Sequence, residues 1–407
     1  MQLYFTKSVC PVCLRTLTAE ISGDADGVYM DKTCPEHGHF HSLIWEDSAE
    51  NYLRWLEYGG MRQGALPKTA EEAERVLAGA DFADCACCQP ASSALMTTNR
   101  CNMDCPVCFT RDKKEPIHEP DLETCGRLLR EYRARAGEDA IVELCGGEPT
   151  VREDICELAS LARDIGFDFI QLNTNGINLA KSPKLCRRLR ESGVTTAYLG
   201  FDALTEKPYF AKYGKPMFEI KKRAVENAAE AGLAVILVCC VIPGENDGDL
   251  GGIVEYAKAN MPAVKGVYFQ PVSYFGRCEL PEPETRLTIP RVIREIEAQT
   301  GGAMKFADFS GGSSFQAWSF SFPVQRAPVP RREVVGAEGH HAALGVGLAD
   351  VAAAQPLEVQ AVRVHEGHAG DGEAVLHGLA QEAVKAVLVL ARSLARAPAT
   401  TGFRTGA

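Results

Sequence analysis

The chain has 407 residues, which is long enough for one large domain with accessory regions or for about two or three ordinary domains. Its net charge of -11 and its pI of about 5.4 disfavour a nucleic-acid clamp, because such proteins concentrate Lys and Arg to neutralise phosphates. No apolar run approaches the roughly 20 residues of a membrane-spanning helix and no secretory signal pattern opens the sequence, so we expect a cytoplasmic protein without a transmembrane segment.

Residues 1–45 are expected to form a Cys/His metal-ribbon-like region. The segments "CPVC" and "CPEHG" repeat one spacing, Cys10-x2-Cys13 and Cys34-x2-His37. Two such knuckles bring three thiolates and an imidazole around one tetrahedral ion. We predict that these four residues bind zinc or iron, with a pair of ordinary turns as the alternative.

Residues 46–92 are predicted to be a helical connector, because apolar residues recur at helical spacing over 49–60 and 69–80. The connector closes with "DCACCQP". Cys85 and Cys88 form a further C-x2-C pair, which ligates an auxiliary iron–sulfur cluster or completes the N-terminal site. The spacing leaves both assignments open.

Residues 93–280 alternate apolar strand-like runs with amphipathic helical segments. The predicted strands are 93–99, 140–147, 167–176, 195–203, 234–244 and 264–272. The predicted helices between them are 122–137, 152–166, 182–193, 218–232 and 249–260. Strand–helix repetition implies a parallel sheet. The fold class is therefore α/β, and the number of units favours a partial (β/α)6 TIM-like barrel, whose chemistry sits at the carboxyl ends of the strands.

Residues 281–407 are expected to be a C-terminal extension that is weakly folded and partly disordered. A short helix over 289–301 and an amphipathic helix over about 372–396 are predicted there. The remaining composition, rich in Ala, Val, Gly and Arg, favours little packed structure. Four histidines in this region are interpreted as surface residues: His340, His341, His365 and His368.

The cysteines fall into two groups, candidate metal ligands and candidate buried thiols. All 16 lie at or before Cys278, and many are clustered at short spacings, which favours metal binding over a disulfide framework. Others lie in apolar or helical surroundings and are expected to be buried free thiols: Cys125, Cys156, Cys186, Cys239 and Cys240.

The stretch "CNMDCPVC" places Cys101, Cys105 and Cys108 in a loop directly after the first predicted strand of the barrel. A closed structural metal site normally takes four protein ligands. Three thiolates can hold three irons of a [4Fe–4S] cube and leave the fourth iron open for another ligand. The triplet therefore indicates a site for chemistry at the mouth of the barrel.

Glycine-rich and polar segments follow the next four strands, namely "CGGEPT", "LNTNG", "LGFDA" and "VIPGEND". Parallel strand ends meet at one face of a barrel, so we expect these segments to surround the cysteine loop. The candidate cofactor-binding residues are Gly146, Gly147, Glu148, Pro149, Asn173, Asn175 and Asp202. Gln270, Ser273 and Arg277 follow the sixth strand and are candidates for contact with a substrate.

The cysteine triplet and the Gly-Gly-Glu-Pro segment one strand later resemble the signature of the radical S-adenosylmethionine (SAM) superfamily. The resemblance implies that Cys101, Cys105 and Cys108 bind a [4Fe–4S] cluster, that the amino acid part of SAM chelates the open iron, and that the Gly-Gly-Glu-Pro segment contacts the amino group of SAM. Many members have an aromatic residue just before the third cysteine. Val107 stands there in this chain, and Phe109 is expected to pack near the adenine instead.

Over about residues 5–280 the combined motifs resemble the branch that contains 7,8-dihydro-6-hydroxymethylpterin dimethyltransferase and archaeal tetraether lipid synthases. This resemblance implies reductive cleavage of SAM to a 5′-deoxyadenosyl radical that abstracts hydrogen from an unactivated C–H bond. Methylation or C–C bond formation on a pterin-like or lipid substrate would follow. An electron donor such as ferredoxin or flavodoxin is implied, and individual catalytic side chains remain unassigned.

Two other functions compete with this hypothesis. The C-terminal part of that branch usually carries further cysteine motifs, and none follows Asp308 here. An iron–sulfur or zinc-binding relative without turnover, serving electron transfer or inactive because of its divergent C-terminus, is therefore one alternative. A zinc protein that binds nucleic acid is the other, and the acidic charge disfavours it.

Overall fold

The computed structural model describes residues 1–13, 15–58, 66–78, 92–108, 116–137, 140–272, 274, 277–281, 286–309, 318–321 and 386–389. Several predicted features lie outside these residues: Cys85, Cys88, Phe109, Ser273 and the four C-terminal histidines.

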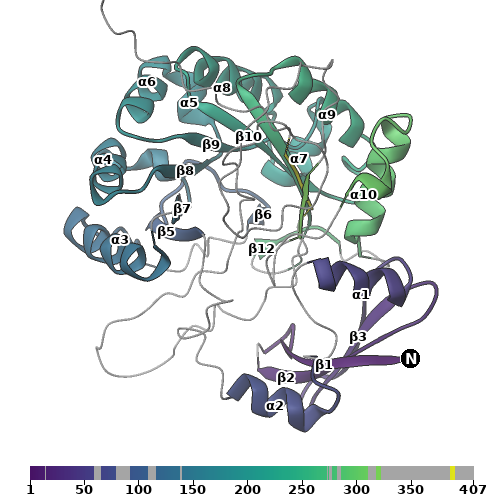
Figure 1. Cartoon of the computed structure of the whole chain (residues 1–407). Helices are drawn as coiled ribbons and strands as arrows, with labels where there is room; N and C mark the ends of the chain where they lie inside the picture. Colours follow the sequence, from purple (N-terminus) through teal and green to yellow (C-terminus); the bar gives the residue numbers. More distant parts are fainter. Residues whose placement is uncertain are drawn as a thin grey trace, which may run out of the picture.

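The N-terminal region is a four-stranded antiparallel sheet that continues into two helices (Figure 1). Its strands, in spatial order, are β1 (Gln2–Val9), β2 (Thr16–Gly23), β3 (Val28–Cys34) and β4 (Gly38–Trp45). Side chains alternate between a buried and an exposed face, as in β2, where Leu17, Ala19 and Ile21 point inward. The β1–β2 and β3–β4 turns lie at the same end of the sheet, so both cysteine knuckles meet there. The connector helices α1 (Ala49–Tyr58) and α2 (Ala70–Ala78) confirm the helical prediction for the part of 49–60 and 69–80 that the structure describes.

The central region contains six parallel strands in sequential order, which confirms the predicted α/β fold class. They are β5 (Ser92–Thr98), β7 (Ile141–Gly146), β8 (Phe169–Thr174), β9 (Thr196–Gly200), β10 (Ala234–Val241) and β11 (Val264–Pro271). The five predicted crossover helices are α3 (Leu122–Ala136), α4 (Ile155–Ile165), α6 (Pro183–Glu191), α8 (Phe218–Glu230) and α9 (Leu250–Ala259). Two short helices that were not predicted, α5 (Ile177–Lys181) and α7 (Lys207–Tyr213), follow the ends of β8 and β9.

Local sequence sets the helix ends. Asp121 caps α3 by accepting a hydrogen bond from the backbone N–H of Thr124, and Ser182 caps α6 in the same way, with Pro183 at its first position. Gly166 ends α4 in the left-handed conformation that glycine adopts without strain. The predicted free thiols Cys125, Cys156 and Cys186 are buried on α3, α4 and α6. On strand β10, Cys239 is buried and Cys240 is half-buried.

The N-terminal sheet is joined to the barrel through α10 (Ile289–Gln299), which was predicted as the helix over 289–301 (Figure 1). Arg294 on α10 donates to the backbone oxygen of Glu46 at 2.7 Å and pairs with Asp47 at 2.7 Å. The Trp55 ring on α1 meets the Phe306 ring edge-on, with centroids 6.3 Å apart. The two regions therefore share a packed interface.

Two strands of the C-terminal extension are described. β14 (Ala386–Val389) pairs antiparallel with β11, and β13 (Trp318–Ser321) pairs parallel with β14. The predicted helix over 372–396 is wrong at Ala386–Val389. The apolar sequence Ala-Val-Leu-Val satisfies a helical pattern as well as a strand, and the unpaired edge of β11 offers backbone hydrogen bonds that favour the strand.

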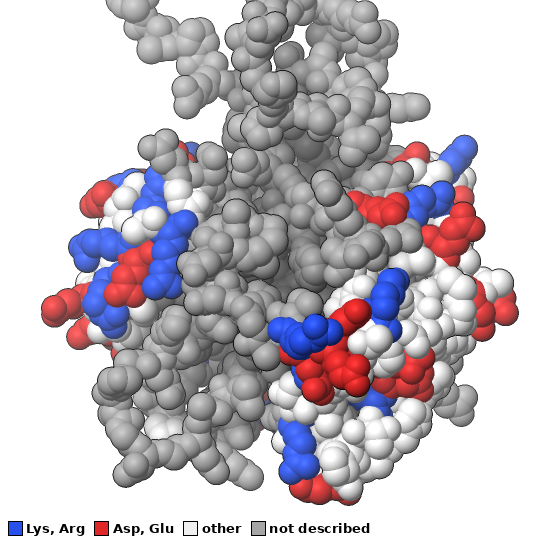
Figure 2. Space-filling view, turned by 60° about the horizontal axis from the view of Figure 1, so that its bottom comes forward, with Lys and Arg blue, Asp and Glu red and all other residues white. Residues whose placement is uncertain are grey.

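The described surface carries mixed charge. On the face shown in Figure 2, Lys and Arg side chains stand beside Asp and Glu side chains. Within the described ranges, no helix is both long enough and apolar enough to cross a bilayer.

Candidate functional site

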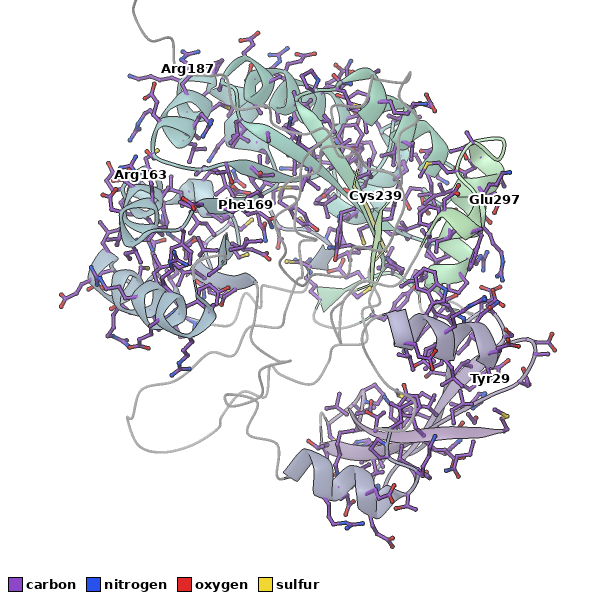
Figure 3. The ribbon with its side chains drawn as sticks, viewed as in Figure 1. Tyr29, Arg163, Phe169, Arg187, Cys239 and Glu297 are labelled. Carbon is purple, nitrogen blue, oxygen red and sulfur yellow. The ribbon has the colours of Figure 1, made fainter. Side chains whose placement is uncertain are left out.

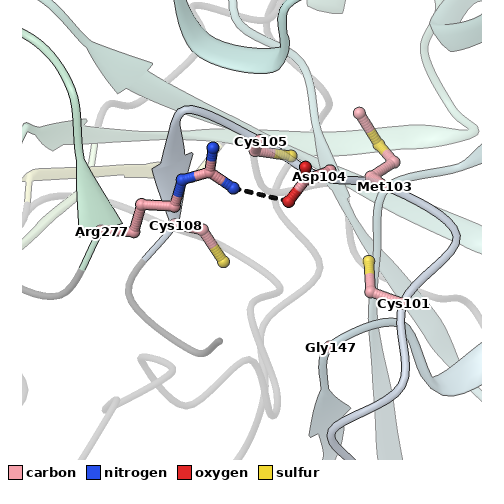
Figure 4. A pocket seen from close by; sticks show the side chains of 7 residues that line it. All are labelled: Cys101, Met103, Asp104, Cys105, Cys108, Gly147 and Arg277. Atoms are coloured by element: carbon pink, nitrogen blue, oxygen red, sulfur yellow. Dashed lines mark hydrogen bonds and ion pairs between the residues drawn. The ribbon is translucent and has the colours of Figure 1, made fainter. Parts of the chain in front are cut away.

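The loop that follows β5 brings three thiols to one pocket. Cys101, Cys105 and Cys108 line it together with Met103, Asp104, Gly147 and Arg277. Figure 4 shows the three cysteine side chains around one space, with the backbone of Gly147 on one side. The structure thus places the predicted cysteine triplet beside the predicted Gly-Gly-Glu segment, at the carboxyl ends of the strands.

A short strand pair holds the far end of the cysteine loop. β6 (Val107–Cys108) pairs antiparallel with β12 (Arg277–Cys278), so the segment after β11 lies against the third cysteine. Arg277 also forms ion pairs with Asp104 at 2.5 Å and with Glu279 at 2.6 Å. Arg277, proposed from the sequence as a substrate contact, therefore braces the cysteine loop in this structure.

One side of the cysteine loop packs against apolar and aromatic side chains. Cys101 and Cys105 pack against a cluster formed by Met103, Ile177, Ala203, Tyr209, Tyr213 and Met217. Burial raises the pKa of the Cys105 thiol to about 11, and repulsion by Cys108 and Cys101 adds to this effect. Deprotonation of the three thiols that line this pocket is therefore favoured only with a cationic partner, and the donor set fits a cluster held by three cysteines, with one coordination position left for a non-protein ligand.

The two glycines after β7 are required by close packing against the end of β5. A Cβ atom on Gly146 would lie 2.1 Å from the backbone oxygen of Thr98, and one on Gly147 would lie 2.4 Å from that of Arg100. The backbone N–H of Gly147 donates to Thr98 at 2.8 Å, and that of Glu148 donates to Arg100 at 2.9 Å. The glycines therefore fix the turn directly against the start of the cysteine loop.

Glu148 lies beneath the pocket and is fully buried. Its carboxylate accepts hydrogen bonds from the backbone N–H of Asn175 at 2.7 Å, from the Thr174 hydroxyl at 2.8 Å, and from the hydroxyl and N–H of Thr150. Burial raises its pKa although these donors act in the opposite direction. The carboxylate, proposed from the sequence as a contact to the SAM ammonium, faces protein donors here and ties the turn after β7 to the end of β8. Pro149, also buried, begins the single turn η3 (Pro149–Val151).

Asn175 is the residue of the third strand end that reaches the cysteine loop, since its Nδ2 donates to Asn102 Oδ1 at 2.8 Å. Asn173 points elsewhere. Its Nδ2 donates to Glu143 Oε2 at 3.1 Å and to the Cys145 sulfur at 2.8 Å, inside the barrel.

Asp202 is fully buried, and partners occupy both carboxylate oxygens. Lys212 donates to it at 2.6 Å, Tyr213 at 2.7 Å and the backbone N–H of Cys240 at 2.8 Å. The predicted ribose contact therefore has no exposed carboxylate surface in this structure.

Sequence reasoning missed two lysines that lie near the cysteine loop. Lys212 on α7 is the partner of Asp202, and Lys221 on α8 is fully buried and donates to the backbone oxygen of Asn175 at 2.7 Å. Both Nζ atoms lie over the Tyr213 ring, at 4.9 and 4.7 Å from its centroid. The only sequence signal was the lone carboxylate of "LGFDA", which needs a counter-charge, and it does not indicate which lysine supplies one.

The four predicted ligands of the N-terminal ribbon meet in space. The ligand atoms of Cys10, Cys13, Cys34 and His37 all lie within 4.8 Å of one another. The Cys13 and Cys34 sulfurs are 3.8 Å apart, close to the roughly 3.8 Å between two thiolates on one tetrahedral zinc ion. Burial raises the pKa of the Cys34 thiol, but hydrogen bonds from Glu36 and His37 outweigh it and lower the pKa to about 6. A thiolate is thus available to a metal at neutral pH.

Comparisons with protein families agree with this geometry. Residues 95–257 match the radical SAM superfamily, and residues 2–46 match the HMPTM N-terminal zinc ribbon domain. The first match begins within β5 and spans the cysteine loop and the parallel strands β7 to β10. The second contains all four ribbon ligands.

Individual relatives match this chain over only part of their own length. The chain is 39% identical over 312 residues to a 7,8-dihydro-6-hydroxymethylpterin dimethyltransferase of Methanocaldococcus jannaschii, covering 75% of this chain and 60% of that protein. It is 30% identical to the mitochondrial GTP 3′,8-cyclase of Arabidopsis thaliana over 43% of this chain and 45% of that enzyme. The chain therefore covers less than two thirds of either relative. Neither gives support to a lipid substrate.

Among solved structures, methylornithine synthase aligns with a TM-score of 0.40 at 15% identity, covering 67% of this chain and 75% of that one.

Proposed function

Because residues 95–257 match the radical SAM superfamily, we propose that this chain cleaves SAM reductively and takes part in the methylation of a pterin-like substrate. The 5′-deoxyadenosyl radical would abstract the hydrogen, and a separate one-carbon donor would supply the methyl group, because the S-methyl group of the cleaved SAM leaves with methionine. The observation that carries the proposal is the pocket in which three cysteine thiols adjoin the Gly-Gly-Glu turn. A low-potential one-electron carrier such as ferredoxin or flavodoxin would supply the electron.

Cys101, Cys105 and Cys108 would hold the cluster, and the backbone of Gly146 and Gly147 would lie along the SAM methionyl group. A [4Fe–4S] cluster bound there would supply one electron for the reductive cleavage of SAM, the source of a radical that could abstract hydrogen from an unactivated C–H bond. The residues of this chain position and shield that chemistry. Asn175 and Arg277 fix the two ends of the cysteine loop, while the aromatic floor of Tyr209 and Tyr213 keeps water from beneath it.

The interior of the barrel supports a pterin-like substrate over a lipid. Glu143 is 3% exposed, and its carboxylate lies near the Tyr198 and Tyr268 side chains. The centroids of these two tyrosine rings are 5.4 Å apart. The hydroxyls of these two tyrosines lie beside each other, with Gln270 next to that of Tyr268, and among the described residues Oε1 of the buried Gln171 lacks a hydrogen-bond partner. A heterocycle with a guanidine-like edge offers both donors to a carboxylate and a flat face to tyrosine rings. A lipid chain would leave these polar groups unpaired.

The test begins with anaerobic reconstitution of the full chain, followed by dithionite and SAM. We expect the wild type to bind iron and sulfide and to form 5′-deoxyadenosine. A Cys105→Ala variant should form none and should lose cluster iron. Cys186→Ala, which removes a buried thiol on α6 that lies in an apolar helix face, is the matched control and should behave as wild type.

Wild-type protein that binds a full complement of iron and sulfide yet forms no 5′-deoxyadenosine would contradict the proposal and favour a cluster-binding relative without turnover. The substrate is tested separately, by incubating the active enzyme with pterin and lipid fractions and searching for SAM-dependent mass increases. Increases confined to the lipid fraction would overturn the pterin assignment alone.

A further inference from the structure

Strands β3 and β4 carry a second group of metal-ligating side chains, apart from the cysteine knuckles. Asp31, His39 and His41 place one carboxylate oxygen and two imidazole nitrogens within 4.8 Å of one another. We propose that these three residues form an open site for a divalent transition-metal ion of the borderline class, such as Zn²⁺ or Co²⁺. This site is independent of the radical chemistry proposed above.

The strand register brings the three residues together. Asp31 is the direct cross-strand partner of His41, and Thr33 is the partner of His39. Because side chains alternate along a strand, these odd-numbered residues share one face of the hairpin, and Cys34 points to the other. The proposed site and the Cys10, Cys13, Cys34 and His37 site therefore lie on different faces of the N-terminal sheet, in which Figure 3 labels Tyr29.

The distances suit a shared ion. Asp31 Oδ1 lies 3.1 Å from His39 Nε2 and 2.8 Å from His41 Nδ1. Ligand atoms at about 2.1 Å from a tetrahedral ion are roughly 3.4 Å apart, so a small outward movement of the rings would admit the ion. The histidine side chains are 58% and 55% exposed, which allows the rings to move and the ion to enter from solvent.

Neighbouring side chains orient both rings. The other nitrogen of His39, Nδ1, lies 3.3 Å from the Thr33 hydroxyl, an arrangement that leaves Nε2 free of its proton when Nδ1 donates to that hydroxyl. The His41 ring stacks on the Tyr29 ring, with centroids 4.8 Å apart and planes at 16°. Metal-bound histidines in proteins are commonly held by such outer contacts.

The ligand set defines the class of ion. Two imidazoles and one carboxylate favour Zn²⁺, Co²⁺, Ni²⁺ or Cu²⁺ over the hard ions Mg²⁺ and Ca²⁺, which prefer oxygen ligands. Three protein ligands leave at least one coordination position open to water or an outside ligand. The competing explanation is a hairpin on which protonated histidines pair with Asp31 and no metal is bound.

The experiment is an anaerobic Co²⁺ titration of the full chain after its cysteine sites have been loaded with zinc and with the iron–sulfur cluster. We expect one further equivalent to bind and to produce weak visible bands without the intense near-ultraviolet absorption of a cobalt–thiolate bond. A His39→Gln/His41→Gln variant should lose this equivalent. His118→Gln, which removes an exposed histidine elsewhere, should retain it.

Two single variants separate a three-ligand site from ordinary histidine affinity. Asp31→Asn should weaken Co²⁺ binding on the order of tenfold or more, and Thr33→Val should weaken it by about tenfold through loss of ring orientation. Zinc retained at the cysteine knuckles shows that each variant still folds. Equal Co²⁺ affinity in the wild type and Asp31→Asn, or an equivalent that survives the double substitution, would overturn the proposal.

Discussion

Three buried charges below the cysteine loop depend on one another. Asp202 pairs with Lys212, while Lys221 contacts the backbone oxygen of Asn175 and the face of the Tyr213 ring. An unpaired charge in such a place costs several kcal/mol, so each of these contacts constrains its neighbours. The group joins α7 and α8 to the ends of β8 and β9, next to the thiols.

Replacement of Lys221 by methionine should reveal its charge through the pH dependence of stability. Burial lowers the pKa of Lys221 from 10.5 to about 8, partly offset by Asp202. Between about pH 8 and pH 10.5 the unfolded chain therefore binds more protons than the folded chain. The destabilisation caused by burying Lys221 consequently becomes smaller as the pH rises through this range. Urea unfolding of cluster-free protein should show the wild type gaining stability relative to Lys221→Met across this window.

The neighbouring Lys222→Met is the control, because its side chain is 36% exposed and pairs with Glu219 at the surface. Its stability difference from wild type should stay constant over the same pH range. A constant difference for Lys221→Met as well would contradict the buried-charge assignment.

Gly147→Ala should distort the turn that faces the cysteines. Its Cβ would lie 2.4 Å from the backbone oxygen of Arg100, so backbone must move, and we expect the free energy of unfolding to fall by about 1–3 kcal/mol. Iron bound after reconstitution should fall as well. Gly248→Ala is the matched control, because a Cβ there meets open space and the variant should bind iron normally. Full iron occupancy in Gly147→Ala would show that the turn tolerates the shift.

At the level of elements, Arg152 joins three segments of the barrel. Its Nη1 donates to the backbone oxygens of Thr97 at 2.6 Å and Pro120 at 2.7 Å, and its guanidinium makes a bidentate pair with Asp154. The Arg152 side chain, which is 2% exposed, thus connects β5 to the start of α3 and to the segment before α4. This contact keeps the end of β5 in register where the cysteine loop begins.

Arg152→Met should destabilise the protein by about 3–5 kcal/mol, because two buried carbonyl oxygens and Asp154 lose their donors. Arg152→Lys should recover only part of this loss, since an ammonium group cannot make the bidentate pair. Thermal or urea unfolding measures both effects. Arg163→Lys, an exposed arginine beside Asp164, should change stability little. Similar stability of Arg152→Met and wild type would refute this role.

For the whole molecule, the interface between the N-terminal sheet and α10 determines whether the two regions unfold together. Trp55 is 3% exposed and packs between Trp45, at 5.4 Å, and Phe306, at 6.3 Å. Arg294 adds polar contacts to Glu46 and Asp47 at the edge. The aromatic contacts carry most of the apolar burial, so they should control the coupling.

Trp55→Ala should lower stability by about 3–5 kcal/mol and loosen the interface. In hydrogen exchange followed by mass spectrometry, protection should fall in α1, β4 and α10 while β7 to β10 keep theirs. Phe210→Ala, which removes an aromatic ring that is 52% exposed, should leave the pattern unchanged. Uniform loss of protection across the barrel would mean that the chain unfolds as one unit.

Features that depend on local spacing could be predicted from the amino-acid sequence. The six barrel strands, their crossover helices and the cysteine knuckles were predicted within a few residues, because hydrophobic period and cap residues act within one element. The spacing of Cys101, Cys105 and Cys108 likewise predicted that these three thiols share one site, and all three line one pocket. The error at Ala386–Val389 arose where a short apolar run fits both a helix and a strand.

Which polar side chains face the pocket, and which are buried behind it, depends on how distant elements pack together. Glu148 and Asp202 follow strands as ligand-binding residues do, yet both are buried against partners from other elements. Arg277 meets Asp104 across 173 positions of sequence. Contacts of this kind are set by the packing of whole elements, and no local pattern encodes them.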